Sequence, residues 1–372
     1  MSEMSSSPLF EKILDRICSC GQRQITFAEY MEMCLYDPDY GYYNSRAIAI
    51  GTEGDFFTST SISSDFGELL AKQIKEYWDS LGQPANFQLV EMGAGEGVLS
   101  KIILDYCKLK YSNFYQNINY IIIEKSHQLK NRQQQLLNPQ IYPIKWLTWL
   151  EIDDNSIVGC FFSNELIDAL SVHKVVKKSG QLREIYITVE NNLLTEKVDQ
   201  LSTLSIEKYF HENGIDLTDE SYPDNYQTEV NLNAIELITK IGQKLKRGYV
   251  LTIDYGYNAS KYYHPQRYQG TLQCYYQHRY HDNPYVNLGT QDITAHVNFT
   301  SLEIAGEKIG LQKIDFTPQA LFLMGLGLGD RLNALSDGTM SLDQIWQRRN
   351  QLHELMNPHG LGGFSVLIQR KN

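Results

Sequence analysis

Short apolar segments alternate with helix-length segments through the middle of the chain, and this alternation limits the folds available to it. The apolar segments are rich in β-branched and aromatic residues. They are FQLVEM (87–92), NYIIIEK (119–125), SIVGCFFSN (156–164) and, after a gap, GYVLTIDYG (248–256). Such strands with helices between them predict an α/β fold whose mostly parallel sheet is covered on both faces. Sheets of this kind bind ligands beyond the carboxyl ends of their strands.

A glycine-rich turn follows the first of these strands. In VEMGAGEG (90–97) the glycines have the spacing G-x-G-x-G. The dinucleotide fingerprint G-x-G-x-x-G would require glycine at position 98, where the chain has Val98, and no Gly-Lys-Ser/Thr of a P-loop follows. The turn therefore matches neither phosphate-binding motif.

Two acidic residues flank this turn. Glu91 and Glu96 would repel a pyrophosphate at the N-terminus of the following helix, whereas they would attract a cationic ligand. S-adenosylmethionine fits, because it carries a sulfonium and an ammonium group but no phosphate. We expect Glu91 to lie near the ammonium group. The methionine end is expected to lie against three glycines, Gly93, Gly95 and Gly97.

The end of the next predicted strand provides a second indication. Glu124 ends NYIIIE, and a carboxylate there can accept two hydroxyl hydrogens from a ribose cis-diol. The alternative is a tight β–α turn with incidental glycines. A second glycine-rich segment, ALFLMGLGLGD (320–330), has Leu323 in place of the acidic residue, so we expect a helix end and a turn there.

Composition excludes several classes of partner. The net charge of −11 disfavours a surface that follows nucleic-acid phosphates or anionic lipid. No apolar run reaches the ~18 residues that a membrane-spanning helix needs. The first residues lack the features of a signal peptide, and Glu3, Glu11 and Asp15 are unusual in an organellar presequence. We expect a cytoplasmic protein without membrane insertion.

Cysteines and histidines give little indication of a metal site. The six cysteines are scattered, and none form a C-x-x-C pair. His278, His281 and Asp282 could hold a metal, but no second cluster matches them, so we favour a hydrogen-bonded loop. We predict that no metal is bound.

Two regions interrupt the alternation of strands and helices. Residues 1–80 are predicted to form helices around a polar loop. Residues 174–235 begin with a hairpin that turns at Ser179 and Gly180 and continue into a helix. We therefore expect a helical N-terminal region with a lid loop (1–80), the first part of the core (81–173), an inserted α+β substrate lobe (174–235) and the remainder of the core (236–372).

The loop in the first region, GTEGDFFTSTSIS (51–63), is a candidate lid. Phe56 and Phe57 would be costly to leave in water. We expect this loop to close over the cofactor, with Asp55 and Thr58 in contact with it. The alternative is an ordinary surface loop.

Five segments together resemble the MidA-like class I methyltransferases. The resemblance runs in order from about residue 25 to the C-terminus. Ser171 replaces a proline that is usual in the family, and Ala94 and Glu96 replace the more usual Pro and Arg. The segments are GDFFTSTSISSDFGELL (54–70), VEMGAGEG (90–97), SNELIDALSVH (163–173), TIDYG (252–256) and QGTLQCYYQHRYHDNPYVNLGTQDITAHVNF (269–299).

This resemblance implies a fold, a cofactor and a substrate. The fold is a Rossmann-like seven-stranded sheet with an antiparallel last strand, which FSVLIQRK (364–371) could supply, and the methyl donor is S-adenosylmethionine. For the family's mitochondrial member, it implies symmetric dimethylation of an arginine in the large hydrogenase-like subunit of respiratory complex I. The implied partner is thus that subunit of an NADH dehydrogenase-type complex; a homodimer is left open.

The segment FFSNELIDALSVH supplies candidate acceptor-site residues. A guanidinium group is protonated, and its lone pairs are delocalised. A carboxylate pair can grip its planar fork and help to remove a proton. Glu165 is the first candidate for this role and Asp168 the second, although the two could instead cap a helix. Asn164 and His173 are weaker candidates, and His173 is equally consistent with a structural role.

Three functions fit these observations. The first is a protein arginine methyltransferase, the second a non-catalytic assembly factor with the same fold, and the third a small-molecule methyltransferase. Glu91, Glu124 and Glu165 favour an active enzyme. The inserted segments favour a protein substrate over a small molecule.

Overall fold

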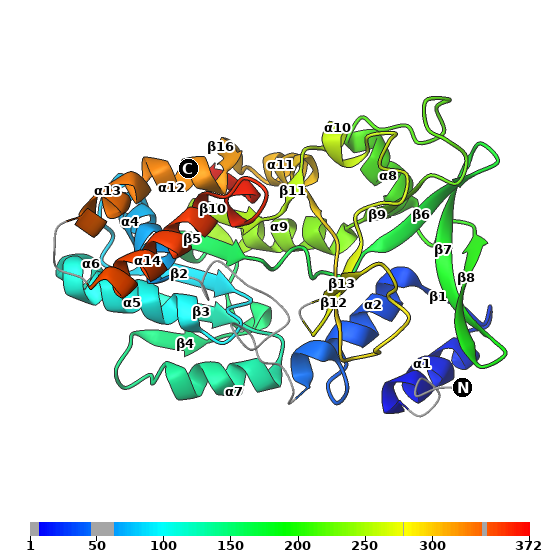
Figure 1. Cartoon of the computed structure of the whole chain (residues 1–372), viewed down its shortest axis with the longest axis horizontal. Coiled ribbons are helices and arrows are strands. Elements are labelled where there is room, and N and C mark those ends of the chain that lie inside the picture. The colour runs from blue at the N-terminus through cyan, green and yellow to red at the C-terminus, as the bar shows by residue number, and fades with distance from the viewer. Residues whose placement is uncertain (1–6, 46–62, 278, 337–340) are drawn as a thin grey trace. The chain divides into compact units, whose positions relative to one another are not determined.

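The computed structural model describes residues 7–45, 63–277, 279–336 and 341–372. The chain forms two compact units and passes between them several times. One, here called the sheet unit, contains residues 49–166, 239–255 and 306–372. The other, the companion unit, contains residues 1–48, 167–238 and 256–305. Figure 1 labels most of the helices and strands of both units.

A seven-stranded sheet forms the centre of the sheet unit, in the order β16-β17-β10-β5-β2-β3-β4. The strands from β10 to β4 are parallel, whereas β17 is antiparallel to both of its neighbours. This confirms the predicted sheet with its antiparallel last strand. The bounds are β2 Phe87–Met92, β3 Ile118–Ile123, β4 Ile144–Trp146, β5 Ile157–Asn164, β10 Leu245–Asp254, β16 Gln312–Pro318 and β17 Ser365–Lys371.

Helices of the sheet unit follow the apolar periodicity of their sequences. In α4 (Ser64–Ser80), Phe66, Leu70 and Ile74 are fully buried in the core that includes β2 and β5. Each such side chain contributes about 1.5–3 kcal/mol through burial. The helix end and turn expected within residues 320–330 are confirmed, because α12 (Gln319–Gly325) ends there and Gly327 has φ +103°. The remaining helices are α5 Val98–Lys110, α6 Ser112–Asn117, α7 His127–Leu136, α12 Gln319–Gly325, α13 Leu328–Asn333 and α14 Leu342–Met356.

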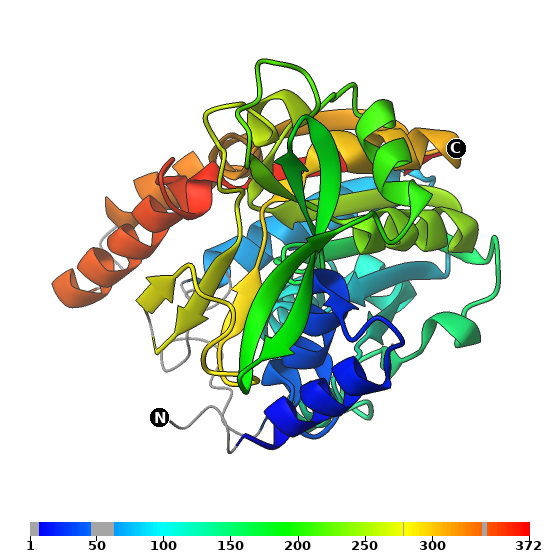
Figure 2. The same ribbon diagram turned by 90° about the vertical axis from the view of Figure 1, so that its right-hand side faces the viewer.

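Three small sheets and several helices form the companion unit. The hairpin of β6 and β7 turns at Ser179 and Gly180, both with positive φ, as predicted. Its long twisted strands are green in Figure 2. The largest sheet has the order β1-β7-β6-β9, with β8 beside β7. Its strands are β1 Ile25–Thr26, β6 His173–Lys178, β7 Gln181–Glu190, β8 Leu193–Asp199 and β9 Gln227–Val230.

The other two sheets come from residues 256–298. One pairs β11 with β15, and the other has the order β13-β12-β14. Their strands are β11 Gly256–Tyr257, β12 Gln273–Tyr276, β13 Arg279–His281, β14 Asp292–Thr294 and β15 Val297–Asn298. The helices are α1 Pro8–Ser19, α2 Phe27–Tyr36, α8 Leu204–Glu212 and α10 Ala259–Tyr262, while α9 Leu232–Lys244 and α11 Phe299–Lys308 continue into the sheet unit.

These units differ in extent from the four expected regions. The helix α4 belongs to the sheet unit rather than to a separate N-terminal region, because its apolar side packs into the core there. Residues 256–305 belong to the companion unit, since their strands pair with one another and add none to the central sheet. The segment outside the sheet core is therefore larger than the expected insertion at 174–235.

Within the described ranges, no helix combines the length and apolar character that crossing a bilayer requires.

Candidate functional site

The glycine turn lies between β2 and α5, at the carboxyl end of the parallel strands. Gly93, Gly95 and Gly97 have φ of +66°, +53° and +84°. A Cβ atom on Gly93 would lie 2.6 Å from Leu166 Cδ1, and one on Gly97 would lie 3.0 Å from Leu137 Cδ1. The positive φ values therefore favour glycine, and a Cβ atom at Gly93 or Gly97 would also displace a neighbouring leucine side chain. The three glycines leave bare backbone on either side of Ala94 and Glu96, as the sequence predicted.

Glu91 lies on β2 beneath this turn and is 3% exposed. Its Oε2 accepts hydrogen bonds from Ser100 Oγ on α5 and, at 2.6 Å, from the Tyr120 hydroxyl on β3. Burial outweighs these two hydrogen bonds and raises the pKa of Glu91 to about 7. The carboxylate thus ties the start of α5 to two strands, and its expected contact with a ligand ammonium group stays a prediction.

Glu96 has a partner that the sequence did not reveal. Its Oε1 lies 2.7 Å from Nη1 of Arg132 on α7, and both side chains are about one third exposed. The pair reduces the repulsion that we expected Glu96 to exert on a phosphate group. The argument against a phosphate ligand then depends more on the glycine spacing than on this charge.

Glu124 follows β3 and is held in a defined orientation. Its Oε1 accepts from the backbone N–H of Ser126 at 2.9 Å, and its Oε2 accepts from Gln133 Nε2 at 3.0 Å. The same Nε2 donates to the carbonyl oxygen of Gly95 at 2.8 Å, while Trp146 Nε1 donates to Gln133 Oε1. Gln133 on α7 therefore connects the carboxylate to the glycine turn. Burial raises the pKa of Glu124.

Sequence reasoning missed Gln133. It lies within the run NRQQQ (131–135), where nothing distinguishes one glutamine from its neighbours. Its role is evident only from the two hydrogen bonds that it donates.

Together these residues fit S-adenosylmethionine. The bare backbone of the turn allows a methionine chain to approach closely, and the oriented carboxylate of Glu124 matches a ribose cis-diol.

Asn164 is the last residue of β5 in the sheet unit, and Glu165 follows it directly. Glu165 has φ +52°, a conformation that is uncommon for any residue other than glycine. Its backbone N–H donates to the Ile253 carbonyl at 2.9 Å, and its Oε1 accepts from Asn164 Nδ2 at 2.9 Å. In the described part of the chain, the buried Oδ1 of Asn164 has no hydrogen-bond partner. Backbone strain such as the positive φ of Glu165 is concentrated at functional sites.

Asp168 and His173 belong to the companion unit. Asp168 is 4% exposed, and its carbonyl oxygen accepts from the Ala295 N–H at 3.0 Å. His173 begins β6, where its Nδ1 lies 2.7 Å from Oε1 of Glu184. Glu184 is fully buried and also accepts from the Ser202 N–H. A common acceptor pocket for Asn164, Glu165, Asp168 and His173 stays a prediction.

Several other candidates lie beyond what the structure describes. Asp55 and Thr58 of the candidate lid, and His278 of the histidine loop, are outside the described residues. Among the residues that are described, no three of His, Cys, Asp and Glu are grouped so that they could hold a metal ion.

Comparison with known sequences identifies the family. Residues 69–317 match the family described as "Putative S-adenosyl-L-methionine-dependent methyltransferase". The chain belongs to this family. It is 29% identical over 383 residues to "Protein arginine methyltransferase NDUFAF7, mitochondrial" of Rattus norvegicus, which covers 96% of this chain and 82% of the relative. The human protein of the same name is 28% identical over 386 residues, with 97% and 82% covered.

A solved structure supports the same conclusion. A protein from Burkholderia thailandensis, crystallised with bound S-adenosyl-homocysteine, superposes with a TM-score of 0.86 at 28% identity. The similarity covers 99% of this chain and 92% of that protein. The chain is therefore a methyltransferase of the class I fold, and S-adenosylmethionine is its cofactor.

Proposed function

We propose that this methyltransferase modifies an arginine side chain of a protein, namely the large hydrogenase-like subunit of an NADH dehydrogenase-type complex, and that its product is symmetric dimethylarginine. Two relatives that align with nearly the whole chain are named protein arginine methyltransferases. The complex and the product are those that the resemblance to the MidA-like family implies. A cytoplasmic location stays part of the proposal.

The conformation of Glu165 and its hydrogen bond with Asn164 are the observation that supports an arginine acceptor most directly. A carboxylate at the end of β5 is held by Asn164 and carries an unfavourable φ of +52°. A residue that only capped a helix would have no need of this conformation. Its cost, of order 1–3 kcal/mol, is consistent with a functional orientation of the side chain.

The chemistry requires alignment and charge. S-adenosylmethionine supplies a methyl group on a sulfonium: the new N–C bond forms as the S–C bond breaks, sulfur keeps that electron pair, and the nitrogen releases a proton. Glu165 would accept N–H hydrogen bonds from the guanidinium, concentrate its positive charge away from the attacking nitrogen and favour loss of the proton. Placement of the nitrogen in line with the methyl group contributes most of the rate.

A single substitution tests this role. Glu165→Gln preserves shape and removes charge, so S-adenosylmethionine affinity should stay within a few-fold while methyl transfer to an arginine peptide falls by roughly 10². Calorimetry and isotope-labelled transfer should be measured on the same preparation. Glu354→Gln, at an exposed position on α14, is the matched control and should leave both quantities unchanged.

Two results would contradict the proposal. Undiminished turnover by Glu165→Gln would make the carboxylate a structural group. Transfer to small molecules but to no arginine peptide, by the unaltered protein, would favour a small-molecule methyltransferase instead.

A further inference from the structure

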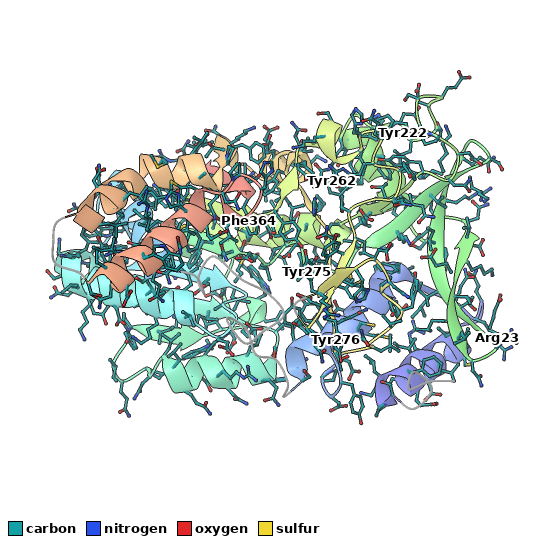
Figure 3. All side chains as sticks on the ribbon, viewed as in Figure 1. Arg23, Tyr222, Tyr262, Tyr275, Tyr276 and Phe364 are labelled. Carbon is teal, nitrogen blue, oxygen red and sulfur yellow. The ribbon has the colours of Figure 1, made fainter. Side chains whose placement is uncertain are left out.

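Gln133 on α7 is a fully buried polar side chain, and both ends of its amide group form hydrogen bonds. Its Nε2 donates to the carbonyl oxygen of Gly95 at 2.8 Å and to Oε2 of Glu124 at 3.0 Å. Its Oε1 accepts from Nε1 of Trp146 on β4 at 2.8 Å. An amide nitrogen carries two hydrogens, so the first two bonds use both. Figure 3 draws the side chains in the view in which Figure 1 labels α7 and β4.

Trp146 determines which way this amide group faces. An indole N–H can only donate, so the amide oxygen faces Trp146 and the amide nitrogen faces Gly95 and Glu124. If the amide were turned by 180°, its oxygen would face two other acceptors and its nitrogen would face the indole donor. These buried groups would then be left without partners, which is costly. The indole therefore stabilises the one orientation in which Gln133 donates to Glu124.

The Glu124 carboxylate is oriented by α7 and can still accept from a ligand. The backbone N–H of Ser126, the N-cap residue of α7, donates to its Oε1, and Gln133 donates to its Oε2. A carboxylate has about four lone-pair sites, so one bond to each oxygen leaves acceptor sites for a cis-diol. Glu124 is also partly exposed, so a ligand can reach it. Gln133 and Ser126 thus hold the group without blocking it.

The glycine turn is held by the same part of α7. A Cβ atom on Gly97 would lie 3.4 Å from Cγ of Gln133, so the side chain of Gln133 lies directly against the turn. Arg132, the preceding residue of α7, donates to Oε1 of Glu96 at 2.7 Å. Two consecutive residues of α7 therefore bind the turn, and one of them also binds Glu124.

These contacts connect the two places where we expect opposite parts of the cofactor. The methionine chain is expected at the glycine turn and the ribose hydroxyls at Glu124. Without the Gln133 amide, the carboxylate would lose one of the donors that orient it, and its link to the turn would be lost. A site whose groups are already oriented binds more tightly, because less freedom is lost on binding.

We propose that Gln133, oriented by Trp146, is a positioning residue for the cofactor. It holds the Glu124 carboxylate in the orientation that accepts from the ribose cis-diol, and it fixes this carboxylate relative to the glycine turn. Gln133 acts through these two groups. The inference concerns the methyl donor alone, so it does not depend on which molecule accepts the methyl group.

The test compares two ligands, S-adenosyl-homocysteine and its 2′-deoxy analogue, which lacks one hydroxyl of the diol. Calorimetry should show that the unaltered protein binds the analogue roughly tenfold more weakly or worse, the loss expected for a hydrogen bond to a charged group. Gln133→Met keeps the length of the side chain and removes the amide. It should weaken S-adenosyl-homocysteine roughly tenfold and reduce the preference for it over the analogue to about threefold or less.

Two further variants complete the experiment. Trp146→Phe removes the indole N–H but keeps an aromatic ring, and it should lower the same preference by a smaller factor. Gln134→Met, at an exposed position next to Gln133, is the matched control and should change neither affinity nor preference.

The ratio of the two affinities separates positioning from a structural role. A glutamine that only supported the fold would weaken both ligands by the same factor, and that result in Gln133→Met would overturn the proposal. Equal binding of the two ligands by the unaltered protein would also overturn it, because Glu124 would then not recognise the diol. If thermal unfolding shows that Gln133→Met does not fold, Trp146→Phe decides, and an unchanged preference in that variant would contradict the proposal.

Discussion

At the scale of single residues, Glu91 links burial to pH. Its pKa is raised to about 7 from 4.5, so the unfolded chain loses its proton at lower pH than the folded protein does. Its contribution to stability is therefore fully present below about pH 4.5 and declines as the pH rises toward 7. A tenfold change in acidity corresponds to ~1.4 kcal/mol, which makes the total decline about 3 kcal/mol.

Glu91→Gln should remove this dependence, because the amide oxygen can still accept from Ser100 and Tyr120 without becoming charged. The free energy of unfolding of the variant, relative to the unaltered protein, should rise by up to about 3 kcal/mol between about pH 5 and pH 8. Denaturant unfolding at several pH values measures it. If the free energies of unfolding of the variant and the unaltered protein changed with pH in parallel, the pKa of Glu91 would not be raised by folding.

Gly95 tests the glycine turn. Valine there would be strained at φ +53° and would place a branched side chain where the methionine chain is expected. Gly95→Val should abolish binding of S-adenosylmethionine, measured by calorimetry, while circular dichroism still reports a folded protein. Gly82→Val is the control, since Gly82 also has positive φ but a Cβ atom there meets nothing within 4 Å. If Gly95→Val bound S-adenosylmethionine normally, the glycine turn would have no role in cofactor binding.

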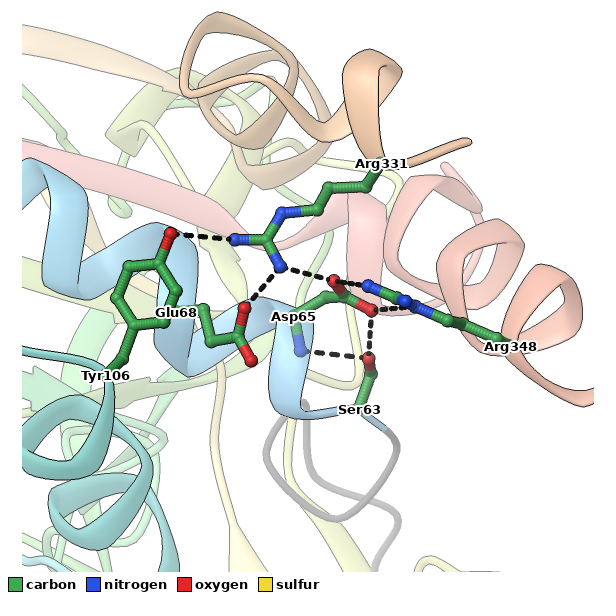
Figure 4. Close-up of polar contacts among 6 residues, drawn as sticks. All are labelled: Ser63, Asp65, Glu68, Tyr106, Arg331 and Arg348. Atoms are coloured by element: carbon green, nitrogen blue, oxygen red, sulfur yellow. Dashed lines mark hydrogen bonds and ion pairs between the residues drawn. The ribbon is translucent and has the colours of Figure 1, made fainter. Parts of the chain in front are cut away.

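At the scale of elements, an ion-pair network joins the start of α4 to α13 and α14 (Figure 4). Asp65 is 1% exposed and accepts from Arg331 Nη1 at 2.8 Å and from two nitrogens of Arg348 at 3.0 and 2.7 Å. Its Oδ2 also accepts from Ser63 Oγ, the cap of α4. Helices far apart in the sequence are thus connected through one carboxylate.

Asp65→Asn should destabilise the protein by roughly 3–5 kcal/mol at neutral pH, because Arg348 loses its carboxylate partner and Arg331 keeps only its ion pair with Glu68. Burial alone would raise the pKa of Asp65, but hydrogen bonds and charge from Arg348, with the charge of Arg331, lower it overall. This stabilisation is therefore present above about pH 4 and is lost as the pH falls through the lowered pKa.

Thermal unfolding at neutral and acidic pH tests the network. Asp79→Asn, at the other end of α4, breaks an ion pair with Lys75 in the same helix, while the amide oxygen can still accept from Gln83, so it should cost about 0.5 kcal/mol or less. An equal loss of stability in Asp65→Asn and Asp79→Asn would contradict the proposed importance of the ion-pair network.

The strands that could be predicted from the sequence were those formed by apolar runs. Residues 87–92 form β2 as expected, whereas β4 has only three residues, and β16 carries the mostly exposed QKIDFTP. Neither of the latter has a pattern that marks a strand. The positions of the glycine turn and of Glu124, directly after β2 and β3, were likewise predictable, whereas their contacts with the cofactor stay predictions. The roles of Gln133 and Arg132 were not predictable, since Gln133 donates to Gly95 and Arg132 pairs with Glu96, both distant in sequence.

At the scale of the whole molecule, both units are assembled from three separated segments of chain. The linear division of the sequence assigned residues 256–305 to the remainder of the core, whereas they belong to the companion unit. The pairing of the strands of this segment with each other is a tertiary property.

Cofactor binding should stabilise the folded protein as a whole. A ligand at a hundred times its Kd adds about 2.7 kcal/mol to the free energy of unfolding. S-adenosyl-homocysteine should therefore raise the unfolding temperature in thermal scans, and NAD should leave it unchanged. A shift with NAD alone would contradict the assignment of the glycine turn.

The central claim is that this methyltransferase modifies an arginine of a respiratory-type complex, and mass analysis of that subunit tests it most directly. The large hydrogenase-like subunit would be isolated from cells with and without this protein, and from cells with only the Glu165→Gln variant. The account predicts a symmetrically dimethylated arginine in the first case and unmodified arginine in the other two. If the subunit were unmethylated in all three kinds of cell, the central claim would be contradicted.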